Sequence, residues 1–172
     1  IQSNNLLFGT IDTWLLWNLT QGDSHITDIT NASRTMLFDA QKNQWSNDLL
    51  KTLKIPKSIL PQVVDNVYDF GETQLFGGSI KIGGMAGDQQ AAAIGQACFQ
   101  PGQSKGTYGT GCFMLLNTGV NRINSQNGLL TTISCDAWGN PVYSIEGSVF
   151  IGGAVIQWLR DELKLINNAA ET

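Results

Sequence analysis

A glycine-rich turn that leads into a helix constrains this chain more than any other stretch. Three of the five residues in 83–87 are glycines, and Asp88 opens an Ala- and Gln-rich run over 88–96. Ala and Gln favour helix and Asp is a preferred N-cap residue, so we expect a helix capped by Asp88. Residues 79–82 alternate as a strand does. This order predicts an α/β fold with Asp88 at the carboxyl end of a strand, where ligands gather in open sheets.

A second glycine turn, Gly109-Thr110-Gly111, precedes the apolar, strand-like segment 112–116. Exposed backbone N–H groups and a threonine hydroxyl at such a corner can cradle a phosphate. The string is not a Walker A loop, because neither Gly-Lys-Ser/Thr nor a helix follows it. Gly-Thr-Gly alone is also common at hairpin corners. Taken together, the two turns favour a hydroxyl beside Asp88 and a phosphate beside Thr110, as phosphoryl transfer requires.

Asp88 has two interpretations. It could be a helix cap and nothing more, but a cap needs neither three preceding glycines nor Gln89 directly behind it. The alternative is a base that accepts a proton from a substrate hydroxyl, a role worth roughly 10²- to 10⁴-fold in rate. The helix terminus would favour the ionised form by about 0.3–1 kcal/mol, which is less than one pKa unit. Position would therefore matter more than basicity.

A third candidate is the start of a helix expected over 153–165. Its apolar residues recur on one face at helical spacing, at Val155, Leu159 and Leu163. Gly153 and the glycine before it would admit a ligand close to the backbone, and Gln157 lies one turn further on. Tight strand-to-helix packing with a solvated Gln157 explains the same residues equally well.

The remaining pattern predicts a mixed α/β chain in two parts, 1–98 and 99–172, divided after Cys98 by a Pro- and Gly-containing connection. The apolar first helix has little sequence before it to bury it, and the last strands and helix begin a domain that they do not complete. The chain is therefore expected to be a piece of a longer protein. The expected elements are helices over 12–19 (capped by Asp12), from Asp28 and over 45–53, a helical turn at 57–60, extended segments over 63–76 and 79–82, and strands over 105–118, 128–135 and 141–148 with a turn at 139–140.

Composition excludes several classes of function. With 42% hydrophobic and 14% charged residues, the 172-residue chain is not expected to be disordered. Ten basic against 14 acidic residues offer no surface for nucleic acid, and no apolar run is long enough to cross a membrane. Cys98, Cys112 and Cys135 stand far apart, which indicates reduced thiols packed in the core of a cytoplasmic protein. The single histidine, His25, is expected in a turn and argues against zinc, and Arg34 is expected to be a structural ion or hydrogen-bond partner.

Several strings together carry a family resemblance, and the most specific are Asn-Ala-Ser-Arg-Thr at 31–35 and Gly-Asp-Gln-Gln-Ala-Ala at 87–92. Through these the chain resembles the glycerol kinases of the FGGY sugar-kinase family, which shares the α/β actin-like ATPase (ribonuclease H-like) fold. The match covers nearly the whole chain, with parts of two adjacent domains: a substrate-side domain that ends in 1–98 and a nucleotide-side domain that begins in 99–172. Further matching strings are 8–17, 27–38, 108–114, 127–133 and 157–161.

The resemblance implies an enzyme that transfers the γ-phosphoryl group of ATP, with Mg²⁺, to a terminal hydroxyl of glycerol, and that is a homo-oligomer when full length. Positioning and charge neutralisation dominate such a reaction. The implied roles are Asp88 as general base with an indirect contact to the metal, Gln89 as a hydrogen-bonding partner of the substrate, Phe113 on the apolar side of the glycerol pocket, Thr110 with Gly109 and Gly111 at the terminal phosphates, and Gly153 and Gln157 on the nucleotide side.

The same resemblance implies that other site residues lie outside this chain, so the fragment alone is expected to be inactive. Residues 68–81 contain no histidine and 77–79 no arginine, which removes the residues of two kinds of regulation found in some family members. Two alternatives stay open. One is a kinase for another polyol or a ketose. The other is a non-catalytic, actin-like nucleotide-binding protein, which could keep the 109–111 corner but would have little use for Asp88.

Overall fold

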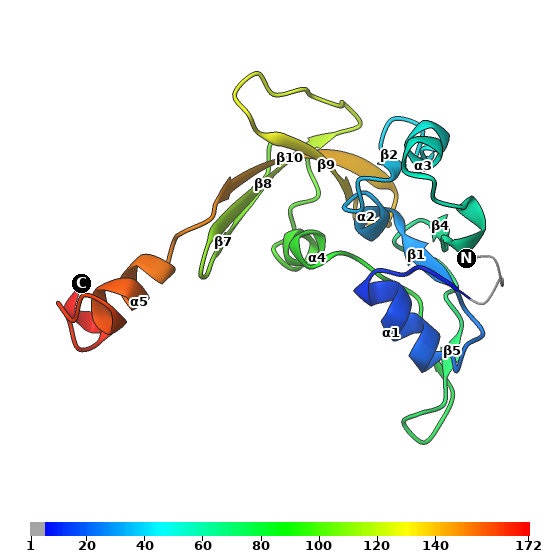
Figure 1. Ribbon diagram of the computed structural model, residues 1–172, viewed down its shortest axis with the longest axis horizontal. Coiled ribbons are helices and arrows are strands. Elements are labelled where there is room, and N and C mark those ends of the chain that lie inside the picture. The colour runs from blue at the N-terminus through cyan, green and yellow to red at the C-terminus, as the bar shows by residue number, and fades with distance from the viewer. Residues whose placement is uncertain (1–5) are drawn as a thin grey trace.

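The computed structural model describes residues 6–172 (Figure 1). Two bodies are visible in it: a first half of short helices and strands, and a longer antiparallel sheet that extends away from it. The helices are α1 (Ile11–Leu19), α2 (Ile29–Ala32), α3 (Asn47–Leu53), η1 (Lys57–Ile59), α4 (Asp88–Gly95), α5 (Ala154–Asp161) and η2 (Ala169–Glu171). The strands are β1 (Ile26–Asp28), β2 (Phe38–Asp39), β3 (Gln44–Trp45), β4 (Gln62–Val64), β5 (Glu72–Thr73), β6 (Ile80–Lys81), β7 (Ser104–Tyr108), β8 (Cys112–Gly119), β9 (Leu130–Cys135) and β10 (Pro141–Val149).

The sheet of the second half has the strand order β7-β8-β10-β9, with antiparallel pairing throughout. The single strand expected over 105–118 is two strands, because the corner at 109–111 reverses the chain between β7 and β8. The turn expected at 139–140 joins β9 to β10, and Gly139 takes the left-handed backbone conformation there (φ 87°). Two glycine-containing turns thus set the register of two strand pairs, β7 with β8 and β9 with β10.

The apolar core lies in the first half and also holds one residue of the sheet. β1 and β4 pair in parallel at its centre. Trp45 is buried, stacks edge-on against Phe38, and donates its indole N–H to the carbonyl of Pro61 at 2.9 Å. Ile133 of β9, 1% exposed, packs into the same cluster and so fixes the sheet to the first half. The members of this core are Ile29, Ala32, Leu37, Phe38, Trp45, Leu50, Leu60 and Ile133.

Several predicted helix boundaries are wrong. The helix expected over 45–53 begins at Asn47, because Trp45 lies in β3 and Ser46 is the N-cap. α1 begins at Ile11 after Thr10, and Asp12 does not cap it: Asp12 is buried and accepts hydrogen bonds from the hydroxyls of Thr10 and Thr27. α5 ends at Asp161, four residues before the predicted end, because Lys164 takes a left-handed backbone conformation (φ 50°) that a helix cannot continue through. The short helix expected from Asp28 is confirmed, with Asp28 as its N-cap.

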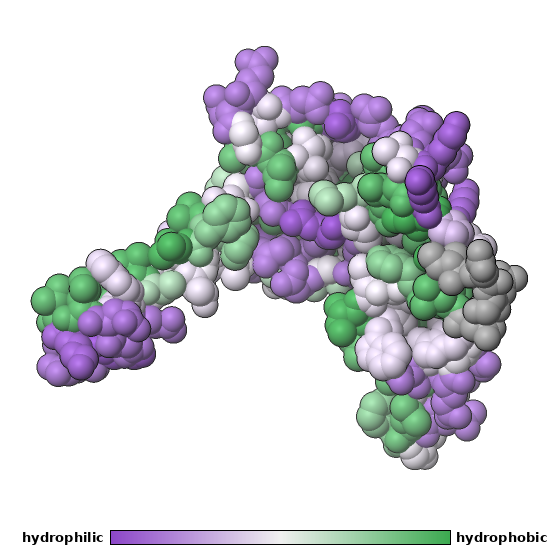
Figure 2. Space-filling model, viewed as in Figure 1, coloured by the Kyte–Doolittle hydropathy of each residue, from purple (hydrophilic) through white to green (hydrophobic). Residues whose placement is uncertain are grey.

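The C-terminal helix stands away from the rest of the chain (Figures 1 and 2). α5 has no buried residue, and the described residues leave its predicted apolar face uncovered, with Val155 40% exposed. Leu163, the last predicted residue of that face, lies beyond the end of α5 and is 43% exposed. Figure 2 shows a hollow on the underside of the molecule, between this arm and the lobe that carries α1. Within residues 6–172, no helix has the length and apolar character needed to cross a membrane.

All three cysteines are free thiols. Cys98 and Cys135 are buried, which confirms their predicted packing role, whereas Cys112 is half-buried. Burial raises the pKa of the Cys135 thiol to about 11, so this side chain is held as the neutral form at physiological pH.

Candidate functional site

The glycine turn before Asp88 is held by hydrogen bonds from the first half of the chain. Asn66 bonds the Met85 backbone twice: its side-chain Nδ2 donates to the Met85 carbonyl at 2.8 Å, and its backbone carbonyl accepts from the Met85 N–H at 2.9 Å. The Thr30 hydroxyl accepts from the Gly87 N–H at 2.9 Å. A Cβ on Gly87 would lie 2.8 Å from Gln90 Oε1, so the end of the Gln90 side chain would have to shift to make room for it.

A buried carboxylate anchors these holding residues. Asp28 is 0% exposed and accepts hydrogen bonds from the Thr30 N–H (2.7 Å), the Thr30 hydroxyl, Asn31 (2.5 Å) and Asn66 (2.8 Å). Burial raises the pKa of the Asp28 carboxyl, and the hydrogen bonds from Thr30 and Asn31 oppose that rise. Asp28 thus joins α2 to the turn that carries Asp88, because Thr30 and Asn66 contact both.

Asp88 is exposed at the start of α4, and the prediction that it caps this helix is wrong. The N-cap is Gly87, whose backbone is extended (φ −61°, ψ 152°), so Asp88 is already the first helical residue. Its Oδ1 accepts only from the N–H of Gln89, at 2.8 Å, among the described residues. The carboxylate therefore faces solvent with one oxygen free, as a proton acceptor for a bound hydroxyl must.

Lys105 is a buried cation beside this pair, and the sequence analysis missed it. It is 1% exposed on β7, and its Nζ donates to Gln89 Oε1 and, at 2.8 Å, to Thr107 Oγ1. Burial lowers the pKa of the Lys105 ammonium, and the charges of Asp88 and Glu146 oppose that shift. The available signal was the period of two in β7, which places Lys105 and Thr107 on one face of the strand.

Glu146 ties the sheet to the first half of the chain. It is 4% exposed on β10, and Arg34 makes a two-pronged ion pair with it, at 2.9 and 3.2 Å. The prediction that Arg34 is a structural ion partner is confirmed. Glu146 lies opposite Leu115 on β8, and Leu115 lies opposite Lys105 on β7, so the glutamate and the lysine share one face of the sheet.

The Gly109-Thr110-Gly111 corner packs against the residues that precede α5. The carbonyl of Gly109 accepts from the Gly153 N–H at 2.8 Å, and that of Thr110 accepts from the Gly152 N–H at 2.7 Å. A Cβ on Gly111 would lie 2.8 Å from the Val149 carbonyl oxygen. None of the glycines at 109, 111, 152 and 153 has a positive φ, so close packing rather than left-handed geometry requires glycine at Gly111, Gly152 and Gly153, whereas a Cβ on Gly109 would meet nothing closer than 3.8 Å.

This packing leaves donors open at the corner. The Gly109 N–H bonds the Gly111 carbonyl at 2.9 Å, whereas the N–H groups of Thr110 and Gly111 bond no carbonyl among the described residues. Thr110 is exposed and Gly111 is buried. Two backbone N–H groups and a hydroxyl at one corner form an arrangement suited to an anion.

The predicted substrate-side residues share one side of the sheet. Phe113 lies opposite Thr107 on β7 and Ser148 on β10, and it lines a hollow of about 460 Å³ that Lys105 also lines. Asp88 opens into a neighbouring hollow of about 610 Å³ formed with α1 and the glycine turn. Lys105 and Phe113 lie on the same face of the sheet, and Lys105 contacts Gln89, so Gln89 lies on the side of the sheet that Phe113 faces.

The predicted nucleotide-side residues are separated. Gly153 lies against the corner, where a Cβ would meet the Gly109 carbonyl oxygen at 2.7 Å. Gln157 is exposed on α5, and its side chain makes no hydrogen bond to the 109–111 corner among the described residues. Gly153 therefore lies at the 109–111 corner, whereas no hydrogen bond joins the Gln157 side chain to it.

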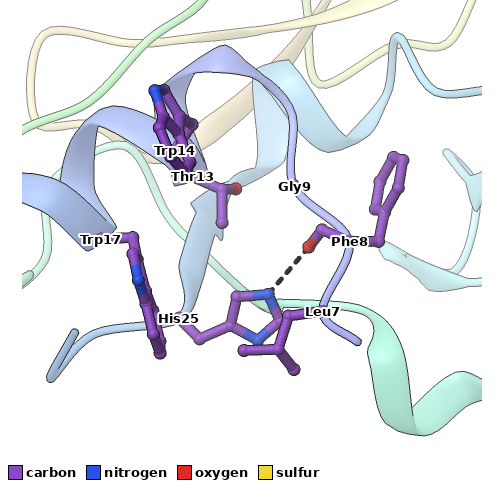
Figure 3. Close-up of a pocket in the computed structure, with 7 residues that line it drawn as sticks. All are labelled: Leu7, Phe8, Gly9, Thr13, Trp14, Trp17 and His25. Carbon is purple, nitrogen blue, oxygen red and sulfur yellow. Dashed lines mark hydrogen bonds between the residues drawn. The ribbon is translucent and has the colours of Figure 1, made fainter. Parts of the chain in front are cut away.

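A third hollow, of about 380 Å³, contains none of the predicted site residues (Figure 3). His25 borders it, donates from Nε2 to the Phe8 carbonyl at 2.8 Å, and stacks edge-on against Trp17. His25 thus joins the chain start to β1. The residues that line this third hollow are Leu7, Phe8, Gly9, Thr13, Trp14, Trp17 and His25.

The residues present fit a metal only in part. No group of three or more His, Cys, Asp or Glu side chains is placed to hold a metal ion anywhere in 6–172. Mg²⁺ commonly keeps several waters and binds through one or two carboxylates together with substrate phosphates. The free oxygen of Asp88 suits such an indirect contact, and the remaining ligands would come from phosphate, water and residues outside this chain.

Two domain models of one protein family match this chain, one after the other. The N-terminal domain model of the FGGY family of carbohydrate kinases matches residues 1–95, and the C-terminal domain model of that family matches residues 105–172. The boundary predicted after Cys98 falls between these matches and stays a prediction.

Individual relatives match almost the whole chain. Glycerol kinases of Clostridium botulinum and Pasteurella multocida are 58% and 55% identical over 99% of it. The crystal structure of Plasmodium falciparum glycerol kinase with ADP superposes with a TM-score of 0.86 at 41% identity, over 96% of this chain and 34% of that one. The chain spans 35% of the length of these curated relatives. The chain therefore belongs to the FGGY family of carbohydrate kinases, with the actin-like α/β fold of that family.

Proposed function

We propose that the full-length protein phosphorylates glycerol to glycerol 3-phosphate with ATP. The observation that carries this proposal is the 58% identity to a glycerol kinase over 99% of this chain. The exposed Asp88 carboxylate and the open N–H groups at the 109–111 corner give that identity a chemical rationale. The ADP bound in the Plasmodium falciparum relative supports a nucleotide as the phosphoryl donor.

In this proposal Asp88 is the general base. A terminal hydroxyl of glycerol lies beside the free carboxylate oxygen and loses its proton to Asp88 as its oxygen attacks the γ-phosphorus. The new O–P bond forms while the bond to the ADP oxygen breaks, so ADP leaves with the electron pair. Asp88 is the first residue of α4 and is not its N-cap, because Gly87 occupies the capping position.

The other residues orient the reactants. The N–H groups of Thr110 and Gly111 and the Thr110 hydroxyl bind the terminal phosphates. Phe113 covers the apolar side of glycerol, Gln89 hydrogen-bonds it, and Gly153 and Gln157 lie toward the nucleotide. Mg²⁺, when bound with ATP, would neutralise developing charge on the phosphates.

The assembly and location of the protein are also proposals. Three free cysteines without a disulfide are consistent with a reducing compartment, and we infer a cytoplasmic enzyme. The full-length protein is proposed to be a homo-oligomer, which size-exclusion chromatography with light scattering would test.

Substrate choice is tested by measuring initial rates of the full-length protein with glycerol and with xylulose at equal concentrations. We expect kcat/KM for glycerol to exceed that for xylulose by roughly 10²-fold, since the proposed glycerol pocket has the apolar Phe113 in its lining, where a larger polar ketose would be less well accommodated. A preference for xylulose would mean that the protein is a ketose kinase and not a glycerol kinase. Absence of turnover with both sugars and polyols would favour a non-catalytic nucleotide-binding protein.

A further inference from the structure

Lys105 is a buried charged residue that contacts Gln89, the neighbour of the proposed base Asp88. No step of the proposed reaction uses it. Its side chain rises from β7 toward the first turn of α4, where Nζ donates to Gln89 Oε1. The Thr107 hydroxyl accepts a second hydrogen bond at 2.8 Å. A lysine that is 1% exposed has lost nearly all its water, so these two acceptors and nearby carboxylates must replace it.

The chemistry of the ammonium group fixes how the Gln89 amide points. A glutamine amide has an oxygen end that accepts and a nitrogen end that donates, and the two ends have nearly the same shape. A lysine ammonium has donors only. The oxygen of Gln89 must therefore face Lys105, which turns the NH₂ group away from β7. No acceptor for that NH₂ group is found among residues 6–172, and Gln89 is half-buried.

The charges around Lys105 favour this arrangement. Asp88 and Glu146 both attract the ammonium, and neither is close enough to form an ion pair with it. Glu146 is already engaged by Arg34, at 2.9 and 3.2 Å. The lysine therefore has a compensating charge on two sides while its hydrogen bonds remain directed at Gln89 and Thr107.

We propose that Lys105 is a positioning residue for substrate binding, which holds the Gln89 amide so that its NH₂ group donates to a hydroxyl oxygen of the alcohol substrate. Gln89 and Asp88 are adjacent at the start of α4, so one side chain donates to the substrate and the other accepts from it. An alcohol with a second hydroxyl next to the reacting one satisfies both groups. This inference rests on the proposed function and deepens it.

The test is steady-state kinetics of the full-length protein with Lys105→Met. One hydrogen bond that orients a binding group is worth about 0.5–1.5 kcal/mol, which corresponds to roughly a 2- to 12-fold rise in KM for glycerol. KM for ATP should be unchanged, because Lys105 contacts no residue of the 109–111 corner. If Lys105 had a purely structural role, Lys105→Met would change KM for both glycerol and ATP, or it would lower thermal stability and leave both KM values unchanged.

A double-mutant cycle separates positioning from general destabilisation. If Lys105 acts through Gln89, then Lys105→Met should have no further effect on the glycerol KM in a Gln89→Ala background. Additive effects of the two changes would overturn the inference, as would an unchanged glycerol KM in Lys105→Met alone. Lys81→Met, which removes an exposed lysine from β6, is the matched control and should leave both KM values unchanged.

Two further outcomes are covered by the design. If Lys105→Met does not fold, Lys105→Leu, which also removes the ammonium group, is measured in both backgrounds with the same criteria. Wild-type turnover of glycerol is measured first. If it is absent, the proposed function fails, whereas a working enzyme that is indifferent to Lys105 overturns only this inference.

Discussion

Glycine serves different purposes at neighbouring positions of the β7–β8 hairpin. Gly111 is required by space, because a Cβ there would lie 2.8 Å from the Val149 carbonyl oxygen and 3.2 Å from the Phe113 ring. Gly106 on β7 has no atom within 4 Å of the same added Cβ. The two glycines therefore form a matched pair for mutation.

We predict that Gly111→Ala in the full-length protein costs about 1–3 kcal/mol of stability, as overpacking typically does. The displaced corner should also bind the nucleotide more weakly, so KM for ATP should rise while KM for glycerol changes less. Thermal unfolding and initial-rate kinetics measure the two effects.

Gly106→Ala is the control for this change, and it should leave stability within about 0.5 kcal/mol of wild type, as an ordinary surface substitution does. Equal behaviour of the two variants would contradict the packing argument for the corner.

Sequence reasoning found the residues whose neighbours in the chain reveal them. Asp88 and Gln89 follow a glycine run, and Thr110 stands between two glycines, so local composition was enough to select them. Lys105 and Glu146 were missed because their importance arises from burial, which depends on contacts distant in sequence. Arg34 reaches Glu146 across 112 residues, and no local pattern indicates that pairing.

Among the secondary-structure elements, those with strong end signals were predicted best. Asp28 caps α2, Pro56 precedes the turn η1, and Gly139 joins β9 to β10. The strand over 105–118 was predicted as one element, because a strand-forming segment lies on both sides of the corner. The length of α5 was also overestimated, since no Gly or Pro marks its end and Lys164 takes the left-handed conformation instead.

The cap of α4 was misassigned for a reason that bears on function. Asp is a common N-cap residue, and the sequence offers no other polar side chain at the turn. In the structure the Thr30 hydroxyl accepts the Gly87 N–H, so a residue from α2 holds the turn from outside. Tertiary contact thereby replaces the local cap and leaves the Asp88 carboxylate exposed.

In the molecule as a whole, α4 and the tip of the β7–β8 hairpin lie on the same underside of the sheet, where Figure 2 shows a hollow. The α/β organisation in two parts was predictable from the order of elements and from the family strings. The relative placement of α4 and the hairpin was not, because it depends on Ile133 packing into the first half and on the Arg34–Glu146 ion pair.

The isolated chain is predicted to have no kinase activity. It spans 35% of the length of its curated relatives, so most of what a full-length relative contains lies outside it. A coupled assay for ADP release by purified 1–172 with glycerol, ATP and Mg²⁺ measures this, beside the full-length protein as positive control. Turnover by the fragment above the no-enzyme rate would contradict the prediction.

The central claim is that the exposed carboxylate at the start of α4 accepts the proton of the attacking hydroxyl. Asp88→Asn in the full-length protein, assayed for kcat with glycerol and for ATP binding by calorimetry, tests it most directly. The account predicts a fall in kcat of at least roughly 10²-fold with ATP binding retained. Wild-type kcat in the Asp88→Asn protein would contradict it.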